Sequence, residues 1–87
     1  MGYFVYIIYS ESYDVFYKGF SERPYERLQE HNDNLSKFTA GKGPWTLVYL
    51  KCFNSKKEAL IAEKKLKRCN RDYIKWKIDQ SENSINK

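Results

Sequence analysis

The sequence predicts an α+β fold in which helices flank a three-stranded antiparallel sheet, with the element order β-β-α-β-α-α. Two N-terminal segments and one segment in the middle of the chain are rich in aromatic and β-branched residues. Capping patterns precede the three segments expected to be helical. The first strand carries apolar residues on both of its faces, and such a strand is usually covered on both sides. We therefore expect helices on both faces of the sheet.

The first two strands, residues 3–9 and 15–19, surround a short polar turn and predict a β-hairpin. If the strands pair directly at the ends of this turn, Tyr6 lies opposite Gly19 and diagonal to Tyr17. The two tyrosines then share one face of the sheet. The alternative is that both are ordinary sheet aromatics, since the chain contains eight tyrosines.

A first helix is expected over residues 23–32, with Ser21 as its N-cap and Pro24 in its first turn. Within it, Arg27 and His31 stand four residues apart, one turn along the same side, and can reach a common point. The alternative for this pair is a solvated polar face that carries no chemistry.

Residues 35–45 contain two glycines and a proline without any sustained period, which predicts a loop with the exposed cations Lys37 and Lys42. Loops of this length are often functional. Residues 46–53 then predict a third strand, antiparallel to one strand of the hairpin.

A second helix is expected to begin after the capping-box pattern of residues 55–58 and to end near Arg68. The expected apolar stripe consists of Ala59, Leu60, Ala62 and Leu66. Glu63 lies inside or beside this stripe, where a carboxylate is out of pattern. It either has a function or forms an ordinary ion pair with Lys67 one turn later.

Asn70 can cap a third helix over residues 71–79. Its apolar contacts are expected from Tyr73, Ile74, Trp76 and Ile78, with Lys75 and Lys77 facing water. Residues 81–87 are polar and follow no period, so we expect a flexible C-terminal tail after a single domain over residues 1–80.

Composition narrows the functional classes. A net charge of +5 suits a polyanionic partner but is also common in proteins that bind nothing acidic. Cys52 and Cys69 are far apart and His31 is the only histidine, so neither a disulfide framework nor a zinc site is indicated. No apolar run approaches the ~20 residues that span a bilayer. We expect a protein of the reduced cytoplasm without a membrane partner.

Five motifs occur in an order and at a spacing that resemble the GIY-YIG nuclease domain family: Val5-Tyr6-Ile7, Tyr17-Lys18-Gly19, Arg27, His31 and Glu63. Residues 27–32, 37–39 and 58–68 resemble the small stand-alone branch of that family. The sequence departs from the family pattern at Val5, where a glycine often stands, and at Lys18 in the second motif. The resemblance implies the same sheet flanked by helices.

The resemblance also implies an endonuclease that hydrolyses nucleic-acid phosphodiesters with one divalent cation, Mg²⁺ or Mn²⁺, and no small-molecule cofactor. By resemblance, Glu63 holds the metal and Arg27 braces the phosphate. Tyr6 is the best candidate to activate the attacking water, with Tyr17 and His31 orienting it or relaying protons. Which of these three residues takes the proton stays open.

We expect nucleic acid, with DNA favoured and a role in repair or processing, to be the partner. The expected binding side chains are Lys37, Thr39, Lys42, Lys64, Lys67 and Arg68. The competing hypothesis is a catalytically inactive, basic nucleic-acid-binding module of the same fold. Because all five site positions carry residues capable of chemistry, the sequence favours the nuclease. Oligomeric state stays open.

Overall fold

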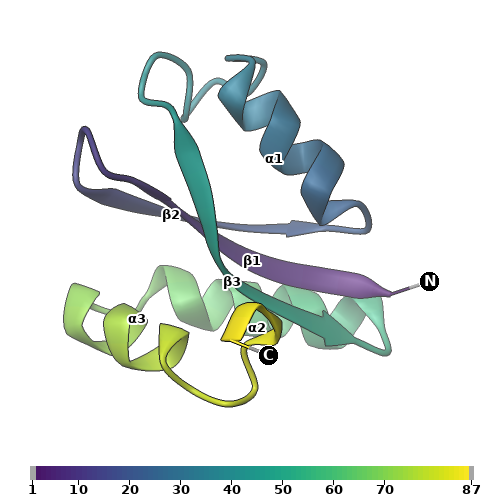
Figure 1. Ribbon diagram of the computed structural model, residues 1–87. Helices are drawn as coiled ribbons and strands as arrows, with labels where there is room; N and C mark the ends of the chain where they lie inside the picture. Colours follow the sequence, from purple (N-terminus) through teal and green to yellow (C-terminus); the bar gives the residue numbers. More distant parts are fainter. Residues whose placement is uncertain (1, 87) are drawn as a thin grey trace.

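The computed structural model describes residues 2–86 and contains the predicted three-stranded antiparallel sheet (Figure 1). Its strands are β1 (Tyr3–Ser10), β2 (Val15–Ser21) and β3 (Trp45–Phe53). The strand order β2-β1-β3 places β1 in the centre, where both of its edges are paired. Strand β2 is therefore one open edge of the sheet.

The register of the hairpin is the predicted one. Tyr6 pairs with Gly19, and Ser10 pairs with Val15 at the turn. The pairing of β1 with β3 shifts by one position between Ile7 and Ile8. The hairpin register places Tyr6 and Tyr17 on the same face of the sheet, as predicted.

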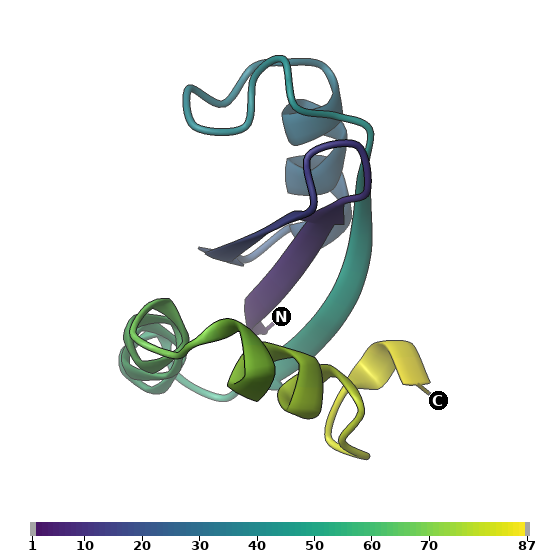
Figure 2. The same cartoon turned by 90° about the vertical axis from the view of Figure 1, so that its left-hand side faces the viewer.

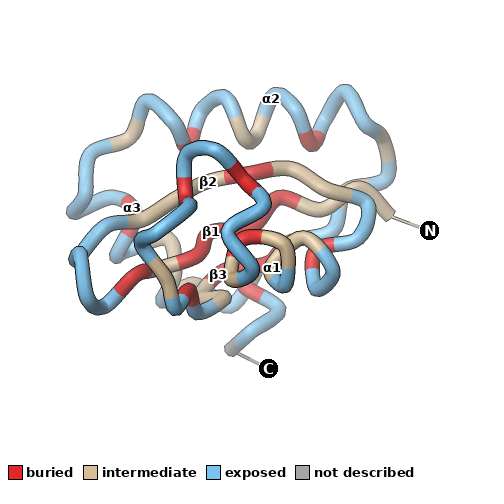
Figure 3. The backbone as a smooth tube through the Cα atoms, turned by 90° about the horizontal axis from the view of Figure 1, so that it is seen from above, coloured by how far each residue is buried: buried red, intermediate tan, exposed pale blue. Residues whose placement is uncertain are grey.

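Helices cover both faces of the sheet, as predicted. Helix α1 (Pro24–Asn32) lies on one face, and α2 (Lys56–Lys67) and α3 (Arg71–Ile78) lie on the other (Figure 1). Within the described residues, no helix is long and apolar enough to cross a membrane. Exposed residues follow the outer sides of the helices, while buried residues concentrate in the sheet (Figure 3).

Each face has its own apolar core. The buried residues on the α1 side are Tyr6, Ile8, Trp45 and Leu50. Those on the α2 and α3 side are Val5, Ile7, Tyr49, Ala59, Leu66 and Ile74. Alternate residues of β1 thus enter different cores, because side chains alternate across a strand.

Two of the three helix starts follow the predicted caps. The Ser55 hydroxyl oxygen accepts a hydrogen bond from the Glu58 backbone N–H at 3.1 Å, which confirms the capping box of α2. The Asn70 side chain likewise caps α3. The expected N-cap of α1 is wrong, because Arg23 occupies that position and Ser21 accepts from the Arg23 backbone N–H instead.

In α2 and α3, some residues predicted to face the sheet point to solvent instead. Leu60 is 41% exposed, because it lies about 100° around the helix from the fully buried Ala59 and so points away from the sheet. In α3, Ile74 is buried as expected, but Tyr73 and Trp76 are exposed. These two helices therefore use narrower apolar faces than their sequences predict.

The C-terminal segment docks against β3. Asn83 is fully buried, and its side-chain oxygen accepts from the Leu50 backbone N–H at 2.9 Å. Its side-chain nitrogen donates to the backbone oxygens of Val48 and Ile78, both at 2.8 Å. A short 3₁₀ helix, Ser84–Asn86, follows. One amide side chain thus joins the chain end to the sheet and to α3.

Glu82 adds a second anchor beside Asn83. Its carboxylate accepts from the Tyr49 hydroxyl at 2.8 Å and forms an ion pair with Lys77 at 2.6 Å. Lys77 is therefore held in this pair instead of facing water as predicted. The expected flexible tail over residues 81–87 is corrected by these contacts, and Lys87 lies outside the described residues.

Candidate active site

Tyr6 lies in the centre of β1, with its side chain across Gly19 of the edge strand. A Cβ atom at Gly19 would lie 2.3 Å from the Tyr6 hydroxyl oxygen, far inside contact distance. Only glycine at this position lets the phenol ring reach over β2 toward the open edge of the sheet. The glycine that ends the second motif thus has a direct role in placing Tyr6.

A buried hydrogen-bond chain starts at the Tyr6 hydroxyl. It lies 2.9 Å from His31 Nε2, and His31 Nδ1 lies 2.7 Å from Thr39 Oγ1. The Thr39 hydroxyl donates to the backbone oxygen of Ser36 at 3.5 Å, so its oxygen is free to accept from His31 Nδ1–H. This assignment leaves Nε2 of a neutral imidazole to accept the Tyr6 proton.

The electrostatics of the pair agree with this assignment. Burial, assisted by the positive charge of Arg27, lowers the pKa of His31 from 6.5 to about 4. Burial and then the neighbouring Tyr17 raise the pKa of Tyr6 from 10.0 to about 12, with Arg27 opposing and Glu63 assisting the rise. At neutral pH the histidine is therefore an uncharged acceptor and the tyrosine an intact donor.

Arg27 and Tyr17 complete the α1 side of the cluster. The Arg27 guanidinium forms an ion pair with Glu30 at 2.7 Å, and this hydrogen bond raises the pKa of Arg27. The Tyr17 ring lies with its centroid 5.1 Å from that of His31. Glu30 is not among the predicted site residues, although its position three residues after Arg27 on one helix is a pattern that predicts such a pair.

Glu63 approaches the cluster from the other layer of the fold. Its side chain is 18% exposed and lies 3.7 Å from Lys67. Its negative charge is the smallest of the named contributions to the pKa of Tyr6. The ion pair with Lys67, which was one of the two alternatives for Glu63, is thus present, and a function of Glu63 stays a prediction.

The donor set suits one kind of metal site. Among residues 2–86, no three histidine, cysteine or carboxylate side chains gather into a group that could enclose an ion. Mg²⁺ usually keeps several waters and binds through one or two carboxylates together with substrate phosphate oxygens. A single, partly buried carboxylate, Glu63, fits an ion held in this open way.

The expected nucleic-acid-binding residues divide into two groups and one exception. Lys37 and Lys42 are exposed on the loop before β3, and three more cations are exposed on α2 and its C-cap: Lys64, Lys67 and Arg68. The loop and α2 both extend to the side of the sheet on which β2 forms the edge (Figure 2). Thr39 is the exception, because it is fully buried and its hydroxyl is bonded to His31. Its predicted contact with nucleic acid is corrected to a structural role.

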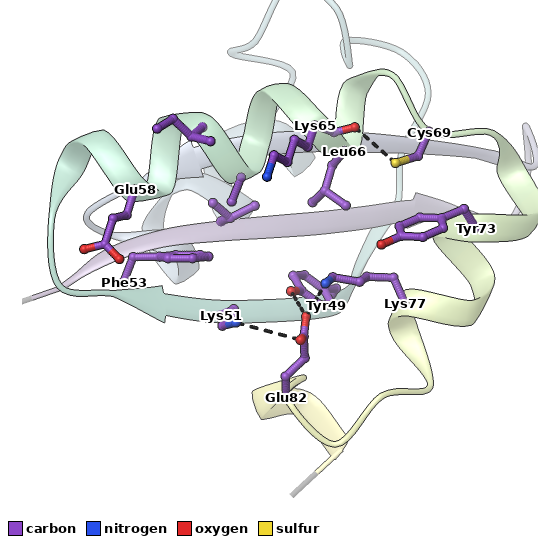
Figure 4. A pocket seen from close by; sticks show the side chains of 13 residues that line it. Tyr49, Lys51, Phe53, Glu58, Lys65, Leu66, Cys69, Tyr73, Lys77 and Glu82 are labelled. Carbon is purple, nitrogen blue, oxygen red and sulfur yellow. Dashed lines mark hydrogen bonds and ion pairs between the residues drawn. The ribbon is translucent and has the colours of Figure 1, made fainter.

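A separate hollow of about 360 Å³ lies between α2, α3 and the sheet (Figure 4). Tyr49 and Leu66 contribute apolar surface, and Glu82 lies on its wall in ion pairs with Lys51 and Lys77. None of the predicted site residues lines it. The candidate active site is thus distinct from this hollow.

The sheet and the helix order, together with the contacts of Tyr6 and Tyr17 with His31, define a class of protein. Residues 2–79 match the family model described as the GIY-YIG catalytic domain. The chain therefore belongs to the GIY-YIG family, which confirms the resemblance found in the sequence. This domain is associated with nuclease activity.

The relatives of the chain are UPF0213 proteins, which form a small stand-alone GIY-YIG family. A UPF0213 protein of Bacillus licheniformis is 41% identical over 66 residues, covering 70% of this chain and 68% of the relative. One from Clostridium perfringens is 33% identical over 70 residues, covering 79% and 74%. The solution NMR structure of a Bacillus halodurans UPF0213 protein superimposes with a TM-score of 0.61 at 27% identity, covering 98% of this chain and 90% of that one.

Proposed function

We propose that this protein is a divalent-metal-dependent endonuclease that hydrolyses nucleic-acid phosphodiesters, with DNA as the favoured substrate. The observation that carries the proposal is the buried chain from Tyr6 through His31 to Thr39, with the charges of Arg27 and Glu63 acting on it. Family membership supports the same class of reaction.

The chain of hydrogen bonds suits proton transfer from an attacking water. As the water oxygen forms its bond to phosphorus, its proton passes to the Tyr6 oxygen, and the Tyr6 proton passes to His31 Nε2. The bond from phosphorus to the leaving sugar oxygen breaks in the same step, and this oxygen takes a proton from solvent water. Tyr6 is then never a free phenolate. Its raised pKa would make a free phenolate unfavourable. Because Thr39 Oγ1 accepts the hydrogen bond from Nδ1–H, His31 is held in the tautomer whose Nε2 can accept the Tyr6 proton.

Two charged groups suit the developing negative charge on the phosphate. The Arg27 guanidinium has five donors in a fixed fork, so it can bind phosphate oxygens while keeping a bond to Glu30. Glu63 would hold Mg²⁺ or Mn²⁺, and such an ion, when bound, supplies positive charge next to the phosphate. Tyr17 beside His31 is suited to orient the water.

Two features of the chain bear on the cellular setting. Cys52 and Cys69 are both free thiols, which agrees with the reduced cytoplasm. The exposed lysines on the loop and on α2 suit contacts to the phosphate backbone, which carry little sequence information. We therefore propose that the protein acts in the processing or repair of DNA, and that it recognises the structure of the DNA and not the base sequence.

The test is incubation of the purified protein with labelled single-stranded, duplex and branched DNA and RNA, with Mg²⁺, Mn²⁺ or EDTA. Cleavage should need metal and should be lost in Arg27→Ala, while Arg23→Ala, which changes an exposed arginine next to the same helix, should cleave normally. Equal cleavage by both variants would indicate a contaminating nuclease. Salt-dependent binding without cleavage of any substrate would instead support the inactive binding module.

A further inference from the structure

The loop between α1 and β3 carries an unusual exposed surface. Phe38 is 72% exposed and Leu35 is 71% exposed, the two highest values among the exposed large hydrophobic side chains of the described residues. Single exposed apolar side chains are common and by themselves indicate nothing. These two, however, lie three residues apart on the loop that also supplies Thr39 to the candidate active site.

The exposure of Phe38 is not the result of a loosely held loop. On either side of it, Ser36 and Thr39 are buried, and the Ala40 backbone N–H donates to the Ser36 oxygen at 2.9 Å. The Trp45 indole N–H donates to the Thr39 backbone oxygen at 3.2 Å. The backbone is thus bonded on both sides of Phe38, and the ring is presented to solvent from a fixed base.

The same segment makes Phe38 the sequence neighbour of a residue in the proposed proton relay. The next residue, Thr39, is bonded to His31 at 2.7 Å, so the ring is one residue away from the proton-relay chain. The exposed cations Lys37 and Lys42 lie on either side of it in the sequence. An exposed aromatic ring between cations is the combination by which proteins hold unstacked bases next to a phosphate backbone.

We propose that Phe38 is a specificity-determining residue that stacks on an unpaired base of the bound nucleic acid. The preferred substrate is then a strand with unpaired bases, either single-stranded or at an overhang or bulge, and not a continuous duplex. In a duplex both faces of each internal base are already stacked, so Phe38 has no partner there. The position of this base next to the cleaved phosphate rests on the proposed function.

Binding in EDTA tests the stacking without requiring cleavage. Phe38→Ala should weaken binding to a labelled single strand and to a duplex with a three-base overhang about tenfold, and leave a blunt duplex of equal length unchanged. Phe38→Trp should keep the affinity, and its added fluorescence should be quenched by the single strand. Trp76→Ala, which removes another exposed aromatic ring from α3, is the matched control and should bind all three like wild type.

The outcomes separate this inference from the proposed nuclease. If Phe38→Ala binds all three nucleic acids like wild type, or weakens all three equally, the stacking role is refuted even where cleavage is observed. If the overhang and single strand alone lose affinity, the role stands, even where no substrate is cleaved. A loss of equal size in Trp76→Ala would show a general aromatic effect and would also refute it.

Discussion

Acidification should weaken the fold through His31. Its imidazole is fully buried, and its pKa is lowered from 6.5 to about 4 by burial and by Arg27. Between these values the unfolded chain binds a proton that the folded protein does not. The stability that His31 contributes is therefore complete above about pH 6.5 and is lost as the pH falls toward 4. At about 1.4 kcal/mol per pKa unit, lowering the pH from 7.5 to 4.5 should cost about 2 to 3 kcal/mol.

Urea unfolding of wild type and His31→Gln over this pH range measures the effect. Carboxylates such as Glu82, whose pKa is lowered mainly by its hydrogen bond to Lys77, also weaken the fold in acid. They are common to both proteins, so the difference between the two curves isolates His31. The wild type should lose about 2 to 3 kcal/mol more than the variant. Parallel curves would show that the pKa of His31 is the same in the folded and unfolded chain. The proposal that a neutral His31 accepts the Tyr6 proton would then lose its support.

Four further predictions concern the remaining parts of the site and the fold. Gly19→Ala should displace the Tyr6 ring, cost about 1 to 3 kcal/mol in thermal or urea unfolding and abolish cleavage, and an unchanged rate would show that the ring position is not needed. Glu63→Gln should eliminate metal-dependent cleavage in a gel assay while changing stability by no more than about 0.5 kcal/mol, so undiminished cleavage would rule out Glu63 as the metal ligand. Asn83→Ala removes four side-chain hydrogen bonds and should lower the free energy of unfolding by at least about 2 kcal/mol, whereas a flexible tail predicts no change. Affinity for duplex DNA should fall with salt, each neutralised phosphate adding about −0.9 to the slope of log affinity against log salt, and a flat response would exclude the phosphate contacts.

The sequence by itself determined the order of the elements and proposed the residues of the candidate site. Alternating and aromatic-rich segments located the three strands, and the hairpin turn set the register that pairs Tyr6 with Gly19. The caps at Ser55 and Asn70 located two helix starts, because a side chain that bonds a backbone N–H a few residues away is a local interaction. Features that depend on neighbours in the sequence were thus readable without the fold.

The tertiary structure alone decided how distant segments meet. It placed Thr39 in contact with His31, and it docked Asn83 on β3. It also turned Leu60 outward, although the residue fits an apolar stripe. In each case the outcome depends on which surfaces pack together. It also depends on which polar groups the packing buries, because each buried polar group needs a partner. Short-range patterns in a sequence specify neither of these.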